Sequence, residues 1–512
     1  MNGAESLART LLACGVDTCF ANPGTSEMHF VAALDRVPGI RAVLALFEGV
    51  ATGAADGYAR MAGRPAATLL HCGPGLANGL ANLHNARRAR SPMVNIVGDQ
   101  ATYHGPLDPP LAAETETWAR PVSTWLRTAT RPAQVGEYAA EAVRAAATPP
   151  GGIATLVLPS DASWEDGGIA QGPLRVPEPA SVAGATIDDA LRILRSGEPA
   201  MLFLGGKALR AGALADAHRI AAATGCRLMA ETFFARMERG RGRFAVDCLP
   251  YGVEAGVAAL AGLRHLILVD ADDPVAFFAY PGLPGRFADP GTQVSTLARP
   301  GEDAADALAR LAEALGAQRI APPTIGTPEP ATGEVTNAAL GQTLAALLPE
   351  DAVVVDEGIT NGFGLYPPMA AAAPHDLLRH VGGAIGIGLP LATGAAIGAP
   401  DRRVVALQAD GSALYTVQAL WTQARERLDI TTVILANRRY AILDRELAAV
   451  GAEPGSASGA LFDLGDPAID WLRIAGGFGI EAARADTMER FADLFVAANR
   501  RPGPFLIELA IA

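Results

Sequence analysis

The stretch RVVALQADGSALYTVQALWTQARERLDITTVILAN, residues 403–437, decides how the last third of this 512-residue chain folds. Its two apolar runs, 403–408 and 430–436, have the length and residue types of buried strands, and an amphipathic pattern over 413–427 predicts a helix between them. A strand–helix–strand crossover of this size makes the two strands parallel. If the strands are neighbours in a sheet, the side chains that follow them emerge at the same edge.

Two polar side chains mark that edge. Asp410 follows the first strand, and Asn437 ends the second strand 27 positions later. Carboxylate and amide oxygens are the hard ligands that Mg²⁺ prefers, and Mg²⁺ usually keeps phosphate oxygens as further ligands. The backbone carbonyl of Arg439 is expected to complete the protein's share. Gly411 permits a tight turn, and free N–H groups at the helix start near Ser412 would face an anion, so the segment predicts a metal-bridged diphosphate.

The same alternation of short apolar runs and helical patterns continues through the rest of the chain. Two stretches rich in Pro and Gly, 163–185 and 316–334, interrupt it and are typical of linkers. The pattern predicts an α/β fold of three successive doubly wound domains with mostly parallel sheets, spanning 1–165, 185–318 and 335–512. Ligands bind beyond the carboxyl ends of strands in such sheets, so residues that follow strands are the candidate site residues.

Composition excludes several classes of function. The net charge of −13, without a basic run, disfavours a nucleic-acid or anionic-membrane partner. Lys207 is the only lysine, so there is no P-loop, and a Schiff base would have to use this residue. Five cysteines without a Cys-x-x-Cys pair indicate free thiols in a reducing compartment. No signal peptide or membrane span is predicted, and we expect a cytoplasmic protein.

Two motifs resemble those of the thiamine diphosphate enzymes. The 403–437 segment is similar to the family's diphosphate-binding signature, Gly-Asp-Gly followed at this distance by Asn. Ala409 replaces the first Gly, and Arg438 replaces the usual small residue after the Asn. Residues 48–60, EGVATGAADGYAR, match the family's pattern E-x-x-A-x-x-x-A-D-G-Y-A-R. The two motifs occur in the family's order, and the resemblance spans almost the whole chain.

The resemblance implies roles for particular residues. Glu48 would hydrogen-bond the aminopyrimidine ring of the cofactor and help to form the ylide. The segment 380–398, HVGGAIGIGLPLATGAAIG, is similar to the family's Gly-rich loop, in which Ile385 would hold the cofactor bent. The other cofactor-binding residues implied are Thr360, Gly383, Gly411, Ser412, Tyr440 and Ala441.

Within the family the chain looks most like benzoylformate decarboxylase. Residues 20–27, FANPGTSE, are similar to its N-P-G-S-x-E turn, so Thr25 is expected to contact substrate through its hydroxyl. His71 matches its first catalytic histidine. The second catalytic histidine should fall within 275–282, where Phe278 and Tyr280 occur and histidine does not. The candidates for the remaining substrate pocket are His29, His104, Gln100 and Phe278.

Two alternatives stay open. One is an acetolactate synthase-like carboligase, against which Leu111 and Ala112 stand in the approximate place of that enzyme's Phe-Gln-Glu. The middle domain shows no match to a flavin site, so FAD is not expected. The other alternative is a non-catalytic relative that retains the fold, which Ala409, Arg438 and the missing histidine favour.

The resulting hypothesis is a thiamine diphosphate- and Mg²⁺-dependent decarboxylase or carboligase that acts on a small 2-oxo acid. The ylide would add to the keto carbon, carbon dioxide would leave, and the enamine would be protonated or joined to an aldehyde. Glu48 would activate the cofactor, while His71 and Thr25 would orient the substrate and relay protons. The resemblance implies that Glu48 and Asp410 meet across a subunit interface, so we expect a homodimer or a dimer of dimers.

Overall fold

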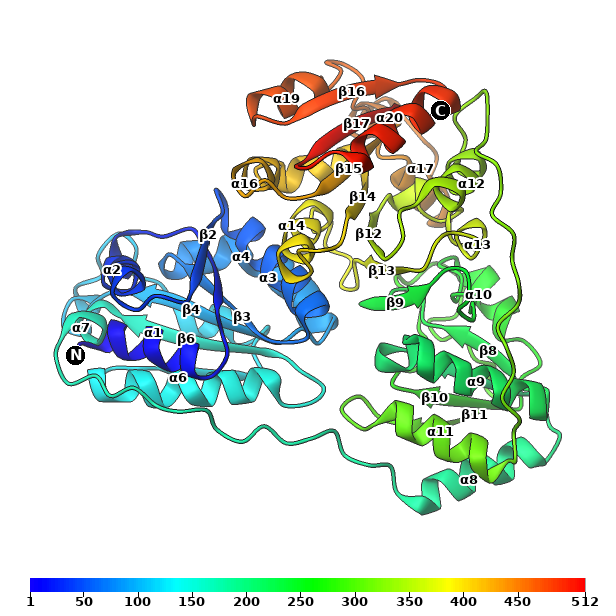
Figure 1. Cartoon of the computed structure of the whole chain (residues 1–512), viewed down its shortest axis with the longest axis horizontal. Helices are drawn as coiled ribbons and strands as arrows, with labels where there is room; N and C mark the ends of the chain where they lie inside the picture. Colours follow the sequence, from blue (N-terminus) through cyan, green and yellow to red (C-terminus); the bar gives the residue numbers. More distant parts are fainter. Residues whose placement is uncertain (512) are drawn as a thin grey trace.

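A computed structural model describes residues 1–511, which fold around three β-sheets covered by helices (Figure 1). The first sheet has the strand order β2-β1-β3-β4-β6-β5, and all its pairings are parallel. Its strands are β1 (Thr18–Ala21), β2 (Arg41–Leu44), β3 (Ala66–Leu70), β4 (Met93–Asp99), β5 (Trp125–Thr128) and β6 (Ile153–Pro159). Its helices are α1 (Gly3–Ala13), α2 (Met28–Arg36), α3 (Glu48–Ala62), α4 (Cys72–Arg88), α5 (Thr115–Ala119), α6 (Pro132–Ala147) and α7 (Ser160–Trp164), with 3₁₀ turns η1 (Thr25–Glu27) and η2 (Gly105–Leu107).

The middle sheet is smaller and also parallel throughout, with the order β11-β10-β7-β8. Its strands are β7 (Ala200–Leu204), β8 (Arg227–Ala230), β10 (His265–Val269) and β11 (Gln293–Ala298). The helices around it are α8 (Gly184–Arg195), α9 (Ala211–Thr224), α10 (Val253–Leu260) and α11 (Ala304–Ala314), with the 3₁₀ turn η3 (Gly206–Leu209). Strands β7 and β10 are buried along their whole length, which their uninterrupted apolar sequences predict.

The third sheet has the order β16-β17-β15-β14-β12-β13-β9. Its strands are β12 (Ala352–Glu357), β13 (His375–Arg379), β14 (Val404–Ala409), β15 (Ile430–Ala436), β16 (Glu481–Ala485), β17 (Phe505–Ala510) and β9 (Arg236–Arg239). Its helices are α12 (Asn337–Leu347), α13 (Tyr366–Met369), α14 (Gly388–Gly398), α15 (Asp410–Ala413), α16 (Ala419–Arg425), α17 (Ala441–Ala449), α18 (Ser456–Phe462), α19 (Trp471–Gly477) and α20 (Met488–Arg500), with 3₁₀ turns η4 (Ile359–Asn361) and η5 (Leu414–Thr416). The predicted α/β fold with mostly parallel sheets is confirmed.

One strand crosses from the middle of the chain to the third sheet. Strand β9 pairs antiparallel with β13, although its residues lie within the segment predicted as the middle domain. Arg236 in β9 donates to Asp376 of β13 at 2.6 Å. The edge of the third sheet is therefore completed by a segment far away in sequence.

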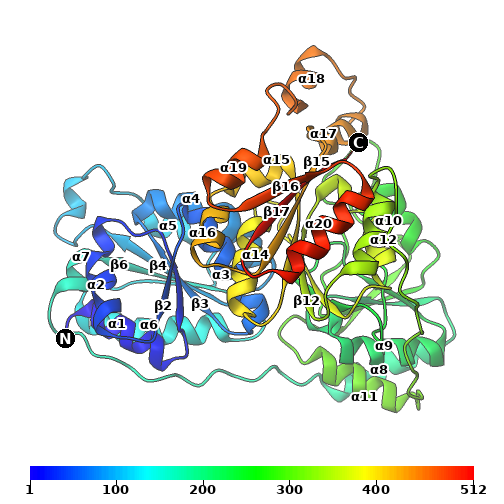
Figure 2. The ribbon, with the colours of Figure 1, turned by 45° about the horizontal axis from the view of Figure 1, so that its top comes forward.

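The first and third sheets are joined by a helix pair, α3 and α14, which lies between them in Figures 1 and 2. The two helices pack backbone against backbone. A Cβ at Gly57 would lie 2.1 Å from the carbonyl oxygen of Leu391, and one at Gly394 would lie 1.7 Å from that of Ala54. Glycine is required at this crossing because no side chain fits between the helices.

The two stretches expected to be linkers have little regular structure. Neither the chain between α7 and α8 nor the chain between α11 and α12 contains a helix or a strand, and both run as long connections in Figure 1. The first connection contains isolated bridges at Asp166 and Ala180. No helix among residues 1–511 combines the length and the apolar character needed to cross a bilayer.

Candidate active site

Strands β14 and β15 are neighbours and parallel, with Ala409 opposite Leu435. Asp410 and Asn437 therefore leave the same edge of the third sheet. Asp410 is buried, and its two carboxylate oxygens accept the N–H of Gly411 at 2.8 Å and the N–H of Arg438 at 2.7 Å. The second bond joins the turn after β14 to the turn after β15, so that Asp410 and the residue after Asn437 are in contact.

The oxygen atoms at this edge retain capacity for a cation. The amide oxygen of Asn437 accepts the N–H of Arg439 at 3.1 Å, and each carboxylate oxygen of Asp410 accepts one recorded bond. The carbonyl of Arg438 is taken by the N–H of Leu464. Arg439 lies opposite Asp463 in an isolated antiparallel bridge. The hydrogen bonds of this bridge are made by the residues on either side, so the carbonyl of Arg439 takes no part in them. These are donors of the type that suits Mg²⁺. Burial raises the pKa of Asp410 because it disfavours the ionised carboxylate. A bound cation would favour the ionised form and oppose this rise.

The helix predicted over 413–427 is interrupted. The chain forms α15 over only Asp410–Ala413, continues as the 3₁₀ turn η5, and resumes as α16 at Ala419. The break allows the hydroxyl of Thr416 to donate to the carbonyl of Gly386 at 2.7 Å. The helix start predicted near Ser412 is therefore only one short turn, Asp410–Ala413. There the Ser412 hydroxyl accepts the Gln408 amide at 2.7 Å.

Tyr440 lies directly over this turn. A Cβ at Gly411 would be 2.4 Å from the Tyr440 ring, so glycine allows the ring to pack against the backbone. Ala441, the next residue, begins α17.

The Gly-rich loop follows β13 and leads into α14. Gly383 and Gly386 have φ angles of +78° and +91°, which favour glycine. Asn85 of α4 clamps the loop, since its side chain donates to the carbonyl of Ala384 at 2.7 Å and accepts the N–H of Ala384 at 3.2 Å. Ile385, the next residue, is partly exposed. The loop is therefore held at the residue that directly precedes the predicted cofactor-binding side chain.

Glu357 is a site residue that the sequence analysis missed. This buried carboxylate ends β12 and accepts the N–H groups of Gly386 at 2.8 Å and Gly388 at 2.8 Å. The amide of Gln408 also donates to it at 2.8 Å. Burial raises the pKa of Glu357, and the donated hydrogen bonds oppose that rise. The sequence does contain a sign of this residue, because Glu357 directly follows the apolar run AVVVD of β12. Strand β12 pairs in parallel with β14, so Glu357 lies at the same edge of the sheet as the end of β14.

Thr360 lies at the same edge, in η4 immediately after β12. Its neighbour Ile359 has a φ of +48°, which is strained for a β-branched residue. Backbone strain of this kind is concentrated at functional sites.

Glu48 is the first residue of α3, and it is buried. One of its carboxylate oxygens accepts the side-chain amide of Asn78 at 3.0 Å. A Cβ at Gly75 would lie 2.9 Å from its other oxygen. The second oxygen therefore lies beside Gly75, where a side chain would be in contact with it. Within residues 1–511 the hydrogen bonds recorded for Glu48 stay in the first domain, and none reaches Asp410.

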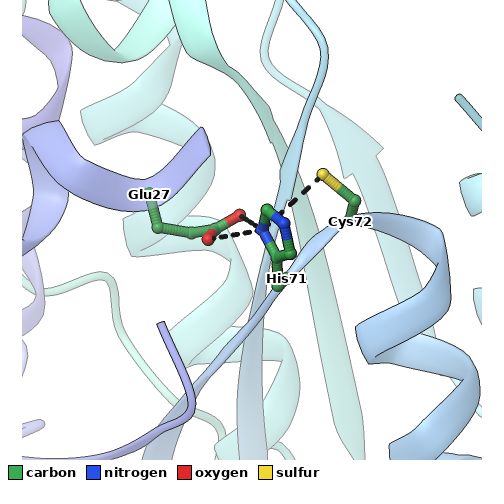
Figure 3. A group of neighbouring side chains, drawn as sticks. All are labelled: Glu27, His71 and Cys72. Carbon is green, nitrogen blue, oxygen red and sulfur yellow. Dashed lines mark hydrogen bonds and ion pairs between the residues drawn. The ribbon is translucent and has the colours of Figure 1, made fainter. Parts of the chain in front are cut away.

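His71 belongs to a cluster at the carboxyl edge of the first sheet (Figure 3). Its Nδ1 lies 2.9 Å from one carboxylate oxygen of Glu27 and 3.2 Å from the other. Cys72 completes the cluster, with its sulfur 3.8 Å from the same nitrogen and 2.9 Å from the hydroxyl of Ser26. A carboxylate in this position fixes the imidazole tautomer and orientation.

Glu27 is the second residue that sequence reasoning missed, although the quoted turn contains it. It is buried and also accepts the N–H of Gly24 at 2.8 Å. Burial raises the pKa of Glu27, and the neighbouring His71 opposes that rise. Burial also raises the pKa of the Cys72 thiol to about 11, so Cys72 stays protonated at neutral pH.

The other predicted substrate-pocket residues are scattered. Thr25 is exposed in η1, close to His71, because the His71 ring packs against Gly24. His29 packs against Trp164 with ring centroids 5.6 Å apart, and His104 is exposed in a loop. Gln100 is half-buried after β4. The structure places Thr25 directly after Gly24, on which the His71 ring packs, but it does not bring His29 or His104 into the cluster with His71.

A cavity of about 710 Å³ lies at the carboxyl ends of the middle strands, where it is also lined by the first domain. Its lining includes Lys207, Glu231, Asp270 and Arg90, and Phe277 and Gly382 also contribute. The predicted residues Glu48, His71 and Asp410 do not line it. The cavity is therefore separate from the predicted catalytic and metal-binding residues.

Family models match both ends of the chain. Residues 1–114 match the thiamine pyrophosphate enzyme N-terminal TPP binding domain, and residues 363–509 match the C-terminal TPP binding domain of the same enzymes. The chain is 52% identical, over 100% of its length and 99% of the relative's, to a Mycobacterium tuberculosis protein named provisionally as an acetolactate synthase large subunit. The chain belongs to the thiamine pyrophosphate enzyme family. The resemblance seen in the two sequence motifs is confirmed.

Further relatives of this thiamine pyrophosphate enzyme bear other names. The chain is 30% identical to the benzoylformate decarboxylase of Pseudomonas aeruginosa, with 97% of the chain and 96% of the relative covered. Among solved structures it is similar to a thiamine diphosphate-dependent 4-hydroxybenzoylformate decarboxylase from Rhodococcus jostii. That match has a TM-score of 0.86 and 26% identity, and it covers 100% of this chain and 99% of the other. The chain is thus a member of an enzyme family in which its relatives are named as acetolactate synthases and benzoylformate decarboxylases.

The residues present fit the family's cofactor. Asp410 and Asn437 offer hard oxygen atoms, the Gly-rich loop leaves space where side chains would intrude, and Glu48 keeps one carboxylate oxygen free. These features lie on the first and third domains, which the two family models match.

Proposed function

We propose that this protein is a thiamine diphosphate- and Mg²⁺-dependent carbon–carbon lyase or carboligase that acts on a small 2-oxo acid. The observation that carries the proposal is the common edge of β14 and β15, where Asp410 and Asn437 present oxygen donors beside a turn kept open by Gly411. When bound, the cofactor supplies a carbanion that adds to the keto carbon and accepts the electrons as carbon dioxide leaves.

Each group of residues has one task in this proposal. Asp410, Asn437 and the carbonyl of Arg439 hold the metal ion, while Glu48 exchanges a hydrogen bond with the aminopyrimidine ring. The residues that hold the rest of the cofactor are Thr360, Gly383, Ile385, Gly411, Ser412, Tyr440 and Ala441. Glu357 fixes the Gly-rich loop by accepting the N–H groups of Gly386, Ile387 and Gly388.

His71 and Thr25 handle the substrate. An ionised Glu27 can only accept hydrogen bonds, so the proton of His71 stays on Nδ1 and its Nε2 is the nitrogen that exchanges protons. The hydroxyl of Thr25 lies in the adjacent turn and can donate to the substrate carboxylate or keto oxygen.

The proposed outcome is acetolactate synthase-like carboligation. The relative with 52% identity bears that name, whereas the benzoylformate decarboxylase relative is 30% identical. The comparisons therefore support this alternative better than the benzoylformate decarboxylase-like interpretation. The second candidate is decarboxylation followed by protonation, which the ordered Glu27–His71 pair favours because it provides a proton donor.

Carbon dioxide release from a panel of 2-oxo acids tests the proposal, with thiamine diphosphate and Mg²⁺ added and with Glu48→Gln measured beside the wild type. We expect the wild type to turn over at least one acid and Glu48→Gln to lose about 10²- to 10⁴-fold in kcat, since a general acid–base group contributes about that much. Pyruvate giving acetolactate would identify the carboligase, and an aldehyde product would identify the second candidate.

Cofactor binding is measured on both proteins by calorimetry, which separates loss of chemistry from loss of the cofactor. Glu137→Gln, a change at an exposed position on α6, is the matched control and should keep wild-type turnover. A protein that binds the cofactor but releases no carbon dioxide from any acid would be the non-catalytic relative. A protein that does neither would refute the proposal.

A further inference from the structure

Glu446 of α17 is held by two tyrosines of the middle domain. The hydroxyl of Tyr280 donates to one of its carboxylate oxygens at 2.5 Å, and the hydroxyl of Tyr251 donates to the other at 3.1 Å. Burial raises the pKa of both phenols, and the Glu446 charge adds to that rise. Both tyrosines therefore stay protonated and continue to donate. We call these three residues the Tyr–Glu–Tyr cluster.

The cluster lies among three segments of the proposed cofactor site. Helix α17 starts directly after Tyr440, which packs on Gly411, and α17 also contacts η4, the turn that carries Thr360. The ring of Tyr251 lies 5.6 Å from that of Phe363, just beyond η4.

Its other side meets the Gly-rich loop. The ring of Tyr251 is 5.7 Å from that of Phe277, and the Phe277 ring leaves no room for a Cβ at Gly383. The cluster thus stands where the third domain's cofactor loops meet the middle domain. This is also the segment, 275–282, in which the family resemblance predicted a catalytic histidine that the chain lacks.

The carboxylate keeps unused acceptor capacity. An ionised carboxylate can accept about four hydrogen bonds, and two are recorded for Glu446. In the part of the chain that the structure describes, no ion pair to Glu446 is recorded, so its charge is not neutralised by a protein cation. His380 packs on Phe233, which in turn packs on Tyr251. Burial lowers the pKa of His380 to about 4, so this histidine supplies no positive charge at neutral pH.

The surroundings of the cluster are aromatic and partly open. Phe277 is 40% exposed and Phe278 is 52% exposed, and the two rings contact each other edge to face at 4.8 Å. Apolar ring surface beside one unneutralised carboxylate suits a ligand with an apolar body and a polar, hydrogen-bond-donating end.

We propose that the Tyr–Glu–Tyr cluster determines substrate specificity by binding a hydrogen-bond-donating group at the end of the 2-oxo acid's side chain. This inference rests on the proposed function, because it assigns the cluster to the substrate of that reaction. Glu446 accepts the donor, Tyr251 and Tyr280 hold the carboxylate in place, and Phe277 contacts the apolar part of the side chain. The group bound is a cation, such as an ammonium, or a neutral hydroxyl.

Matched pairs of 2-oxo acids test the proposal and distinguish its two arms. The cation arm compares 4-(aminomethyl)phenylglyoxylate with 4-ethylphenylglyoxylate, and the hydroxyl arm compares 6-hydroxy-2-oxohexanoate with 2-oxoheptanoate. The quantity measured is the ratio of kcat/KM within each pair, from carbon dioxide release by the holoenzyme. We expect at least one ratio to favour the donor-bearing acid by about 10- to 100-fold, the range for hydrogen bonds to a charged group.

Variants assign the preference to the cluster. Glu446→Gln should bring that ratio close to one, and Tyr280→Phe should lower it by a smaller factor because the carboxylate loses one of its two supports. Glu453→Gln removes one negative charge from an exposed position beyond the same helix and should keep the wild-type ratio. Circular dichroism and cofactor affinity verify that each variant is folded and loaded.

Binding measurements separate the failure of this inference from failure of the proposed function. The same pairs are titrated by calorimetry into Glu48→Gln holoenzyme, which should bind substrate without turning it over. Preferential binding that Glu446→Gln abolishes supports the cluster even if the wild type releases no carbon dioxide. Turnover with ratios near one, or with ratios that Glu446→Gln leaves unchanged, overturns the inference while the function stands. No binding and no turnover overturn both.

Discussion

At the scale of single residues, the Glu27–His71 pair is the most informative feature, because a buried carboxylate orients a half-buried imidazole. We predict that Glu27→Gln lowers kcat for carbon dioxide release by at least about tenfold, because the carboxylate that orients the imidazole is lost. The acid limb of the pH–rate profile should also shift, because Glu27, whose pKa burial raises, no longer titrates in the variant. The glutamine keeps an acceptor for the Gly24 N–H, so the turn should persist.

Ser26→Ala is the control for this pair. It removes the hydrogen bond to the Cys72 thiol and leaves both contacts between Glu27 and His71. Its pH–rate profile should match that of the wild type. An unshifted acid limb in Glu27→Gln would mean that Glu27 has only a packing role.

A second residue-scale prediction concerns stability in acid. Burial lowers the pKa of His375 in β13 to about 4, whereas an exposed imidazole titrates near 6.5. Between these values the unfolded chain binds a proton that the folded chain does not. The stabilisation is present above pH 6.5 and is lost as the pH falls toward 4, by about 1.4 kcal/mol per pH unit for this one proton.

We therefore expect His375→Gln to have a shallower decrease of melting temperature between pH 6.5 and 4 than the wild type, with thermal melts at three or four pH values as the measurement. His104→Gln, a change at an exposed histidine, should keep the wild-type slope. His380, whose pKa burial also lowers to about 4, remains in both proteins and does not affect the comparison. Equal slopes in the variant and the wild type would contradict the prediction.

At the scale of secondary-structure elements, the contact between α3 and α14 joins the first and third sheets. A Cβ at Gly394 would lie 1.7 Å from the Ala54 carbonyl oxygen, and helix backbones cannot yield as a flexible side chain can. Gly394→Ala should destabilise the protein by about 1–3 kcal/mol, although alanine favours a helix by up to about 1 kcal/mol.

Gly212→Ala in α9 is the matched control, because no atom lies within 4 Å of the added Cβ. This variant should be neutral or slightly stabilised in thermal or denaturant unfolding. If both alanine variants behaved alike, close packing would not be the reason for glycine at position 394.

At the scale of the whole molecule, Glu48 and Asp410 lie on different domains, and the hydrogen bonds recorded for each stay within its own domain. If the two are brought together by a second copy of the chain, then Glu48→Gln and Asp410→Asn are each inactive alone. Co-expressed chains should recover up to about one quarter of wild-type activity. Half of a random mixture would be heterodimers, each with one intact site and one site that carries both changes.

Mass photometry on the same samples measures the oligomeric state, and a homodimer or dimer of dimers is expected. Two copies of Glu48→Gln labelled differently and co-expressed form the control and should stay inactive. A wholly monomeric protein with full turnover, or a mixture without any recovery, would contradict a site shared between subunits.

The larger features could be predicted from the sequence because local patterns carry them. Apolar runs of strand length and the spacing of Asp410 and Asn437 predict parallel strands that end at one edge, and β14 and β15 are arranged in this way. The prediction of one helix over 413–427 was wrong in part, because an amphipathic pattern does not reveal that Thr416 donates a hydrogen bond to the carbonyl of Gly386. A tertiary hydrogen bond there favours a 3₁₀ turn over a continuous helix.

What the sequence alone determined is the α/β layout and the family, since periodicity and a motif such as residues 48–60 are properties of neighbouring positions. Only the tertiary structure decided which distant groups meet. It placed Glu27 on His71, Glu357 under the Gly-rich loop, and Glu446 between Tyr251 and Tyr280. These contacts join residues from about 30 to nearly 200 positions apart, and at such separations the packing of whole elements, rather than local pattern, determines which side chains touch.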